Sequence, residues 1–235
     1  MCGRYTLTPS RKELEVGFSQ LTALPQDRIF AERFNVAPTQ EVVGITHPND
    51  APAPVAELLR WGLVPHWAPS PDTEVKMINA RAETVLEKPS YKGLIEEASG
   101  RCLIIADGFY EWEAIKGSTK QPWRFTVDGG IPFAFAGLCS TWTPKDSGPP
   151  LRSCVIITTE PNALVKPIHN RMPAILADQA SQEAWLNPMV GGEEAAGLLK
   201  PLADSRMEKA KAAKAVGKPS NEGPLLLLPE QEGLF

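Results

Sequence analysis

Cys2 has the most distinctive chemistry in this 235-residue chain, because it directly follows Met1. Removal of Met1 would leave Cys2 with a free α-amine beside its thiol, a 1,2-aminothiol that no internal residue can supply. An amine condenses with an aldehyde to an imine, and a neighbouring sulfur can close on that imine to give a thiazolidine ring. Because the α-amine has a pKa of about 8 and the thiol of about 8.5, both keep a usable unprotonated fraction near neutrality. Alone, a cysteine at this position is a weak signal.

Six stretches of the chain combine residue types that serve recognition or catalysis more than packing. They hold aromatic rings, arginines, an amide, a carboxylate and a histidine, which together could grip a phosphodiester and move protons. The stretches are Met1–Tyr5, Arg33–Pro38, Arg60–Trp67, Asn79–Thr84, Asp107–Trp112 and Ile168–Pro173.

Each candidate in these stretches has a structural alternative. Asn79 and Arg81 would share one face of a strand, or would only satisfy local backbone groups. Glu111 lies between two aromatic residues, a setting that raises the pKa of a carboxyl group and makes it a useful proton donor; a surface glutamate fits the pattern equally well. His169 precedes an arginine in an expected loop, although a lone histidine is more often structural. Trp67 fits a buried core as well as a binding surface.

Composition and charge limit the class of protein. A hydrophobic content of 43% with 22% charged residues is typical of a soluble globular protein, and the net charge of -4 argues against binding polyanions through bulk charge. No apolar run could span a membrane and no signal peptide is recognisable, so we expect a cytoplasmic protein. The cysteines lack CxxC spacing, and three of them have apolar neighbours typical of small core residues: Cys102, Cys139 and Cys154. We expect no metal or cofactor.

The pattern of turns and apolar runs predicts an α+β protein. Helices are expected from Ser10 to about Gln20, from Ser90 to Ala98 with Ser90 as the cap, and from Asp178 or Gln179 to Leu186. Strands are expected over residues 41–46, 55–64, 101–106, 108–115, 122–128, 132–139 and 152–159. The series predicts a single compact domain over residues 1–235, with a mostly antiparallel, barrel-like sheet and short flanking helices. The basic, Ala-rich residues 206–218 are expected to be a solvated surface segment.

The six stretches, in this order, resemble the SOS response-associated peptidase (SRAP) family from Cys2 to at least Leu186. The resemblance implies a compact, mostly β fold with a positively charged cleft that binds single-stranded DNA at abasic sites. It also implies that the processed N-terminal cysteine forms a thiazolidine crosslink with the ring-opened abasic aldehyde. The chain departs from the family pattern at Gly217, where an Asn is expected, so the resemblance does not fix how residues 206–235 pack.

The resemblance also implies roles for individual residues. Cys2 would be the nucleophile, and Asn79 would position its amine. Glu111 would act as acid and base, and His169 would aid proton transfer in ring opening and in crosslink reversal. The residues expected at the DNA are the phosphate contacts Arg4, Arg81 and Arg171, the stacking surfaces Trp67 and Trp112, and the further contacts Asn35 and Pro38.

Three functions remain open on these grounds. The first is covalent capture of abasic sites by a monomer, through lyase-like imine chemistry and with removal of Met1 that could be autoproteolytic. The second is a cysteine peptidase that uses Cys2 with His169. The third is a non-covalent single-stranded DNA binding module, whose DNA retention would survive Cys2→Ala. A bacterial protein of this kind would associate with the nucleoid in the SOS response to DNA damage.

Overall fold

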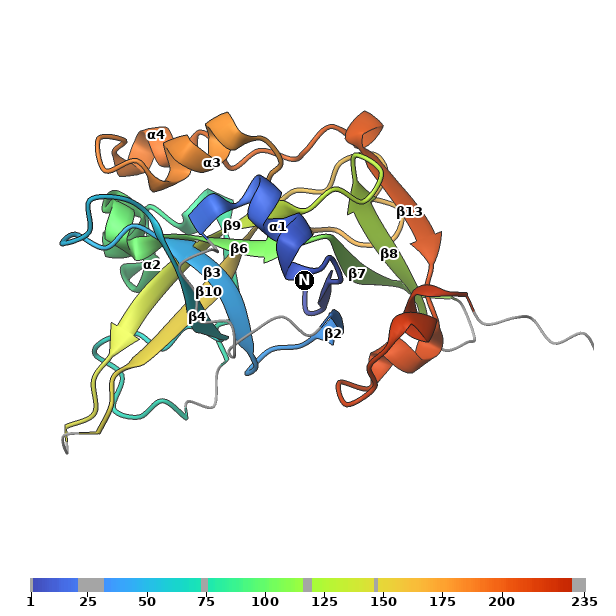
Figure 1. Ribbon diagram of the computed structural model, residues 1–235, viewed down its shortest axis with the longest axis horizontal. Helices are drawn as coiled ribbons and strands as arrows, with labels where there is room; N and C mark the ends of the chain where they lie inside the picture. The colour runs from blue at the N-terminus through green and yellow to red at the C-terminus, as the bar shows by residue number, and fades with distance from the viewer. Residues whose placement is uncertain (1, 21–31, 73–75, 116–119, 146–147, 230–235) are drawn as a thin grey trace, which may run out of the picture.

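The computed structural model describes residues 2–20, 32–72, 76–115, 120–145 and 148–229, and β-sheet dominates them (Figure 1). The strands are β1 Tyr5–Leu7, β2 Arg33–Val36, β3 Glu41–Thr46, β4 Val55–Trp61, β5 Asn79–Arg81, β6 Arg101–Ala106, β7 Gly108–Glu113, β8 Gln121–Val127, β9 Phe133–Trp142, β10 Leu151–Thr159, β11 Met172–Pro173, β12 Ile175–Leu176 and β13 Met207–Lys211. The α-helices are α1 Arg11–Gly17, α2 Pro89–Glu96, α3 Gln179–Leu186 and α4 Gly192–Ala196. Short 3-10 turns include η2 Ala82–Thr84, η5 Lys214–Gly217 and η6 Pro224–Leu227.

The larger sheet closes on itself. Its central strands follow the order β10, β4, β3, β6, β9, and β9 also pairs with β10, which completes a five-strand ring. The pairing is antiparallel except where β10 lies parallel to β4 and to the short strand β5. A closed ring leaves none of its five strands with an unpaired edge. The predicted α+β fold with a barrel-like core is therefore confirmed.

The second sheet packs against this barrel through aromatic side chains. Its strand order is β13, β8, β7, β1, β2. The ring of Tyr5 on β1 lies 5.5 Å from that of Trp61 on β4 and 5.7 Å from that of Phe135 on β9. Phe109 and Phe125 stack at 5.0 Å on the same sheet. Both sheets therefore share one hydrophobic core, which fixes the first strand of the chain against the barrel.

Helix boundaries follow local capping chemistry. Ser10 caps α1 and completes a capping box with Glu13, as predicted, although the helix ends at Gly17 and not near Gln20. Asp178 caps α3, which ends at Leu186 as predicted. The prediction of Ser90 as the cap of α2 was wrong. That helix starts one residue earlier, at a proline, whose missing N–H costs nothing in the first turn.

Strand boundaries agree well with the sequence pattern where apolar runs are long. β3 and β6 have the predicted bounds, and β10 begins one residue early. β4 ends at Trp61 and not at residue 64, because Gly62 follows with φ of 135°, a conformation that breaks the strand. β9 continues to Trp142, three residues past its expected end, because it pairs with β10 along that length.

Residues 206–218 lie at the surface, with Lys211, Lys214 and Lys218 exposed as predicted, but part of the segment is a strand of the second sheet. Residues 207–211 form β13, which pairs antiparallel with β8 at the edge of the second sheet. Met207 and Val216 are buried, and the ammonium of Lys209 lies 5.2 Å from the ring centre of Trp123. Within β13 only Met207 is buried, so the basic, Ala-rich composition gave no sign of a strand. In Figure 1 this part of the chain (orange to red) lies beside β8.

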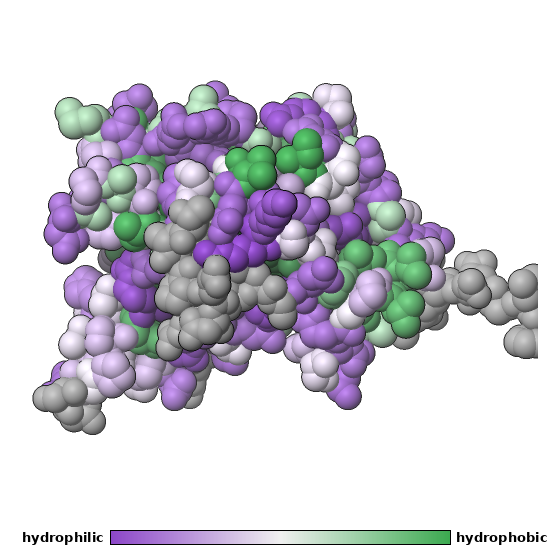
Figure 2. Space-filling model, in the orientation of Figure 1, coloured by the Kyte–Doolittle hydropathy of each residue, from purple (hydrophilic) through white to green (hydrophobic). Residues whose placement is uncertain are grey.

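The surface shown in Figure 2 is mostly hydrophilic, with small separate hydrophobic patches. Among the large exposed hydrophobic residues of the described chain, Trp67 is the aromatic one, and 60% of its surface is exposed. In the described residues no helix is both long and apolar enough to cross a membrane.

Candidate active site around Cys2

Cys2 lies just before β1, inside the molecule. Its side chain is fully buried, and its carbonyl accepts a hydrogen bond of 2.9 Å from Nδ2 of Asn79 on β5. Two residues later, the carbonyl of Arg4 accepts a hydrogen bond from the backbone N–H of Tyr110 on β7. Chain ends usually fray unless they are tied down. These two bonds tie the N-terminal residues to both sheets.

The thiol of Cys2 is held in its protonated form. Burial raises its pKa well above the ordinary value, and the charge of Glu111 raises it further. Sγ donates a long hydrogen bond of 3.9 Å to the carbonyl of Arg4. A base must therefore take the thiol proton when the sulfur reacts. The other three cysteines are buried, as predicted; Cys2 shares their burial, which the sequence did not predict.

Glu111 on β7 is a buried carboxyl group. Its residue is only 2% exposed, so the alternative of a surface glutamate is wrong. Burial raises the pKa of Glu111 from 4.5 to about 7, in the predicted direction. A carboxyl group that titrates near neutrality can donate a proton and take one back under the same conditions.

His169 faces Glu111 from the loop between β10 and β11. Its Nδ1 lies 3.9 Å from Oε1 of Glu111 and accepts a hydrogen bond of 3.0 Å from the backbone N–H of Arg171. This bond requires the neutral tautomer with its hydrogen on Nε2, whereas a bond from Nδ1 to the carbonyl of Arg171, 3.1 Å away, requires the other tautomer. Burial lowers the pKa of His169, which favours the neutral ring at pH 7.

The two polar atoms of the Asn79 side-chain amide differ in their contacts. Nδ2 holds the carbonyl of Cys2, while the buried Oδ1 accepts no hydrogen bond from the described residues. Buried polar atoms are almost always paired, so this oxygen is suited to accept a hydrogen bond from a bound ligand. Asn79 and Arg81 lie on the same side of β5, with buried Ala80 between them, as predicted.

The three arginines that the sequence assigns to phosphates lie in different surroundings. Arg81 is exposed at the end of β5. Arg171 donates two hydrogen bonds, of 2.6 and 2.9 Å, to the carboxylate of Glu83. Arg4 donates to the side chain of Asn35 and to backbone carbonyls near the C-terminal end. Arg81 therefore has the guanidinium most open to a ligand.

The two tryptophans assigned to DNA also differ. Trp67 is exposed, in a shallow hollow formed with Pro89 and Leu94. Trp112 is half-buried on β7, and its ring lies 6.5 Å from that of Tyr110. Trp67 can therefore present a ring face to a base. Only part of the Trp112 ring is accessible, because neighbouring residues cover the rest.

Asn35 and Pro38 lie on and just after β2. Asn35 is fully buried, and its Nδ2 donates to the carbonyls of Lys218 and Asn221. Its side-chain hydrogen bonds join it to Arg4, Lys218 and Asn221, which favours support of neighbouring residues over contact with substrate. Pro38 is half-buried.

Glu83 is a site residue that the sequence did not single out. Glu83 follows Arg81 by two residues, and its place in the stretch Asn79–Thr84 was the only sequence feature that pointed to it. Its partner Arg171 is 88 positions away, and Arg171 also donates to the carbonyl of Thr158 on β10. The Glu83–Arg171 pair thus holds the backbone that contacts His169.

A comparison with protein families identifies the family of this chain. Residues 1–219 match the family model described as SOS response associated peptidase (SRAP). This chain belongs to the SRAP family. The match spans all of the residues gathered around Cys2, and the resemblance proposed from the sequence is confirmed.

Curated SRAP relatives carry names that refer to DNA lesions. Abasic site processing protein YoqW of Bacillus subtilis is 41% identical over 228 residues, which cover 97% of this chain and 99% of YoqW. Abasic site processing protein HMCES of Gallus gallus is 33% identical over 202 residues, which cover 75% of this chain and 58% of HMCES. Abasic site processing protein YedK of Escherichia coli is 28% identical over 233 residues and is covered completely.

Solved structures show the same fold. A crystal structure of a Bacteroides thetaiotaomicron protein superposes with a TM-score of 0.79 at 28% identity, over 97% of this chain and 99% of that one. A Bordetella bronchiseptica protein gives a TM-score of 0.75 at 24% identity, over 90% and 100% of the two chains, which supports the fold alone.

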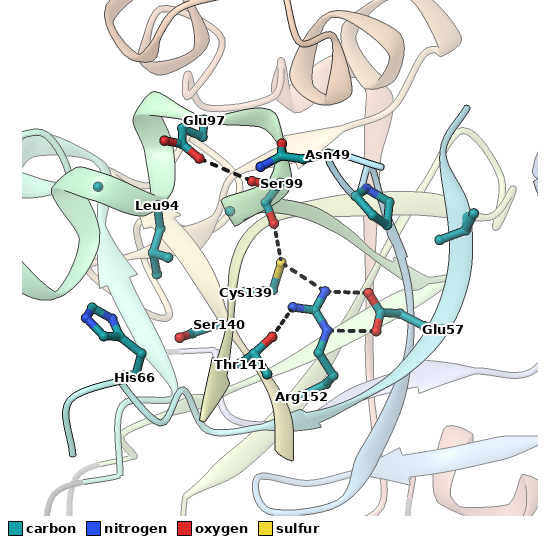
Figure 3. Close-up of a pocket in the computed structure, with 14 residues that line it drawn as sticks. Asn49, Glu57, His66, Leu94, Glu97, Ser99, Cys139, Ser140, Thr141 and Arg152 are labelled. Atoms are coloured by element: carbon teal, nitrogen blue, oxygen red, sulfur yellow. Dashed lines mark hydrogen bonds and ion pairs between the residues drawn. The ribbon is translucent and has the colours of Figure 1, made fainter. Parts of the chain in front are cut away.

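A separate cavity of about 520 Å³ is lined by residues that include Glu57, Cys139 and Arg152 (Figure 3). Arg152, near the start of β10, donates two hydrogen bonds to Glu57, and its Nη2 lies 3.8 Å from the sulfur of Cys139. Asn79, by contrast, lies beside Ile156 in the second half of β10. The SRAP site and this cavity are therefore distinct.

Proposed function

We propose that this SRAP protein captures abasic sites in single-stranded DNA through a thiazolidine link to Cys2, once Met1 has been removed. The observation that carries the proposal is a buried cysteine at position 2, whose carbonyl Asn79 holds, beside the facing side chains of Glu111 and His169. The names of YoqW and HMCES, which are abasic site processing proteins, support the choice of lesion.

The first bond forms between nitrogen and carbon. When the abasic sugar opens, it presents an aldehyde, and the α-amine of Cys2 adds to the aldehyde carbon to give a carbinolamine. Glu111, as the neutral acid, gives its proton to the departing hydroxyl group, so that water and an iminium ion form. Glu111 is left as a carboxylate.

The second bond forms between sulfur and carbon. The carboxylate of Glu111 takes the thiol proton as Sγ of Cys2 adds to the iminium carbon, which closes the ring. The products are a thiazolidine and one water molecule, and Glu111 ends protonated, as it began. The raised pKa of the thiol is no obstacle, because a base beside it accepts the proton. Holding all three reacting groups together makes closure effectively intramolecular.

The surrounding residues have separate roles in the proposal. The Nε2–H of His169 donates to the sugar oxygen during ring opening, and Oδ1 of Asn79 accepts a hydrogen bond from the amine. Arg81 binds a phosphate and Trp67 stacks on a base. Stacking of this kind tolerates any sequence, which suits a protein that recognises a lesion.

The peptidase alternative has weaker support. The nucleophile of a cysteine peptidase is a thiolate with a lowered pKa, whereas burial raises the pKa of Cys2.

The capture reaction still requires removal of Met1, because too many bonds separate the amine of Met1 from the thiol of Cys2 for a five-membered ring to form. The third alternative, non-covalent binding, predicts the same behaviour for the wild-type chain and Cys2→Ala.

A denaturing gel with an abasic single-stranded oligonucleotide tests the proposal. We expect a crosslinked band for the wild type and none for Cys2→Ala. Cys2→Ala and Cys2→Ser both keep the α-amine, so each should form only an imine, which yields a stable band only when borohydride reduces it. Intact mass spectrometry should show protein without Met1 plus the oligonucleotide minus one water. A chain that lacks Met1 and still forms no adduct would contradict the proposal.

A further inference from the structure

We propose that Arg4 is a positioning residue that the C-terminal segment, residues 214–228, holds in place to fix Cys2, and that Arg4 does not bind phosphate. The inference rests on the capture reaction proposed above. It gives a role to the C-terminal segment, whose packing the family resemblance left open, and a different role to Arg4 from the phosphate contact that the resemblance implies.

The guanidinium of Arg4 is engaged inside the protein. Nη1 donates a hydrogen bond of 2.8 Å to Oδ1 of Asn35 and one of 2.5 Å to the carbonyl of Val216. Nη2 donates a bond of 3.1 Å to the carbonyl of Gly217. Three acceptors fix the plane of the group, and burial lowers its pKa. A guanidinium held in this way has few donors left for a phosphate.

The segment that supplies these carbonyls is itself anchored to β2. Nδ2 of Asn35 donates to the carbonyls of Lys218 and Asn221, at 3.0 and 2.9 Å. Oε2 of Glu222 accepts a hydrogen bond of 2.8 Å from the backbone N–H of Phe34. Asn35 thus bonds both to Arg4 and to the segment that holds Arg4.

Apolar packing completes the attachment. Val216 is fully buried against Tyr110 and Ala212, and the hydroxyl of Tyr110 donates to the carbonyl of Phe34. The backbone N–H of the same tyrosine donates to the carbonyl of Arg4. The main chain of Arg4 is therefore fixed by β7, and its side chain by the C-terminal segment.

This arrangement sets the position of Cys2. The carbonyl of Arg4 lies 3.9 Å from Sγ of Cys2, so a shift at Arg4 would move the thiol relative to Asn79 and Glu111. The presence of Gly217 in place of the Asn expected for the family does not disturb these hydrogen bonds, because Arg4 donates to the backbone carbonyl of this residue. A Cβ added at Gly217 would meet no atom within 4 Å.

Glu222 gives the sharpest test, because a carboxylate cannot bind phosphate. Single-turnover crosslinking should be measured against DNA concentration for the full chain. Glu222→Ala removes the acceptor for Phe34, and the limiting rate should fall by roughly tenfold, with the half-saturating DNA concentration unchanged or lower. Glu222→Gln keeps an acceptor oxygen and should restore most of the rate.

Arg4→Gln and Arg81→Gln form a matched pair for the phosphate question. Arg4→Gln should lower the limiting rate and leave the salt dependence of DNA binding unchanged. Arg81→Gln should weaken binding and reduce the slope of log K against log salt by about 0.7, the value for one phosphate on a single strand. Melting temperatures show whether Arg4→Gln folds. If it does not fold, the rates of Glu222→Ala and Glu222→Gln test the inference.

The outcomes separate this inference from the function beneath it. A wild-type chain without Met1 that forms no crosslink overturns the capture reaction, and the inference with it. A wild type that crosslinks, alongside a Glu222→Ala variant with an unchanged limiting rate, overturns the inference alone. The same holds if Arg4→Gln loses as much salt dependence as Arg81→Gln.

Discussion

Asn79 donates a hydrogen bond of 2.9 Å to the carbonyl of Cys2, across 77 positions of the sequence. The bond ties the second residue of the chain to β5, which in turn pairs with β10 of the barrel. A reactive residue near a chain end is thereby held by the most regular part of the fold. The same amide keeps its oxygen available to a ligand.

Replacing Asn79 should slow capture without unfolding the protein. Asn79→Ala removes both the donor to Cys2 and the unused oxygen, so the crosslinking rate should fall by roughly one to two orders of magnitude. Asn79→Asp keeps the shape but loses the donor, and should be as slow. Single-turnover crosslinking measures the rates, and equal rates for all three chains would contradict the assigned role.

The capture rate should pass through a maximum at about pH 7.5, midway between the pKa values of Glu111 and the α-amine, and fall on either side. Glu111 must be the neutral acid to expel water, so its pKa of about 7 sets the upper limb of the pH–rate profile, the side on which the rate falls as the pH rises. The lower limb comes from the α-amine, which is protonated below a pKa of about 8. In Glu111→Gln the overall rate should drop and the upper limb should disappear. Rates measured from pH 5.5 to 9 at constant ionic strength check both features.

Burial of Glu111 should also make folding stability depend on pH. Because the folded-state pKa is about 7 and the ordinary value is 4.5, the unfolded chain loses this proton first as the pH rises. Stability is full below about pH 4.5 and falls by about 3 kcal/mol by pH 7. Glu111→Gln should therefore raise the melting temperature at pH 8. Glu208→Gln, at an exposed position on β13, should leave it unchanged.

Glu83→Gln should slow capture without weakening DNA binding. The change removes the charge that holds Arg171, whose backbone N–H sets the orientation of His169. Loss of a negative charge cannot weaken attraction to phosphate, so the dissociation constant should stay the same or fall. Rate and affinity measured in parallel test this split, and a weaker affinity would argue against it.

Trp67→Ala should weaken binding of undamaged single-stranded DNA. Loss of one stacked base costs about 1–3 kcal/mol, which corresponds to roughly 5–150-fold in affinity. Because the side chain is 60% exposed, the melting temperature should hardly change. Ile131→Ala, at an exposed apolar residue of the β8–β9 turn, is the matched control. Fluorescence anisotropy that shows equal affinities for both variants would remove Trp67 from the site.

The sequence predicted those parts of the fold that depend on local patterns. The capping box at Ser10 and the apolar runs of β3 and β6 specify their elements without help from distant residues. The short strands β2 and β5 are not among the strands that apolar runs predicted. Each is only a few residues long and exists because a partner strand pairs with it.

The candidate site was predictable in its residues but not in their contacts. Aromatic neighbours on β7 indicated the raised pKa of Glu111 from sequence alone. The pairing of Arg171 with Glu83 and of Arg4 with Val216 joins residues 88 and 212 positions apart. Such contacts depend on how the two sheets pack, and no local pattern encodes that.

The burial of Cys2 has a consequence for the energetics of the reaction. A residue at the end of a chain normally samples many conformations, and ordering it would oppose ring closure at the moment of reaction. Here folding has already ordered it. The activation entropy of capture should therefore be close to that of a rigid cyclic aminothiol, and the temperature dependence of the rate should report mainly the enthalpy of bond making.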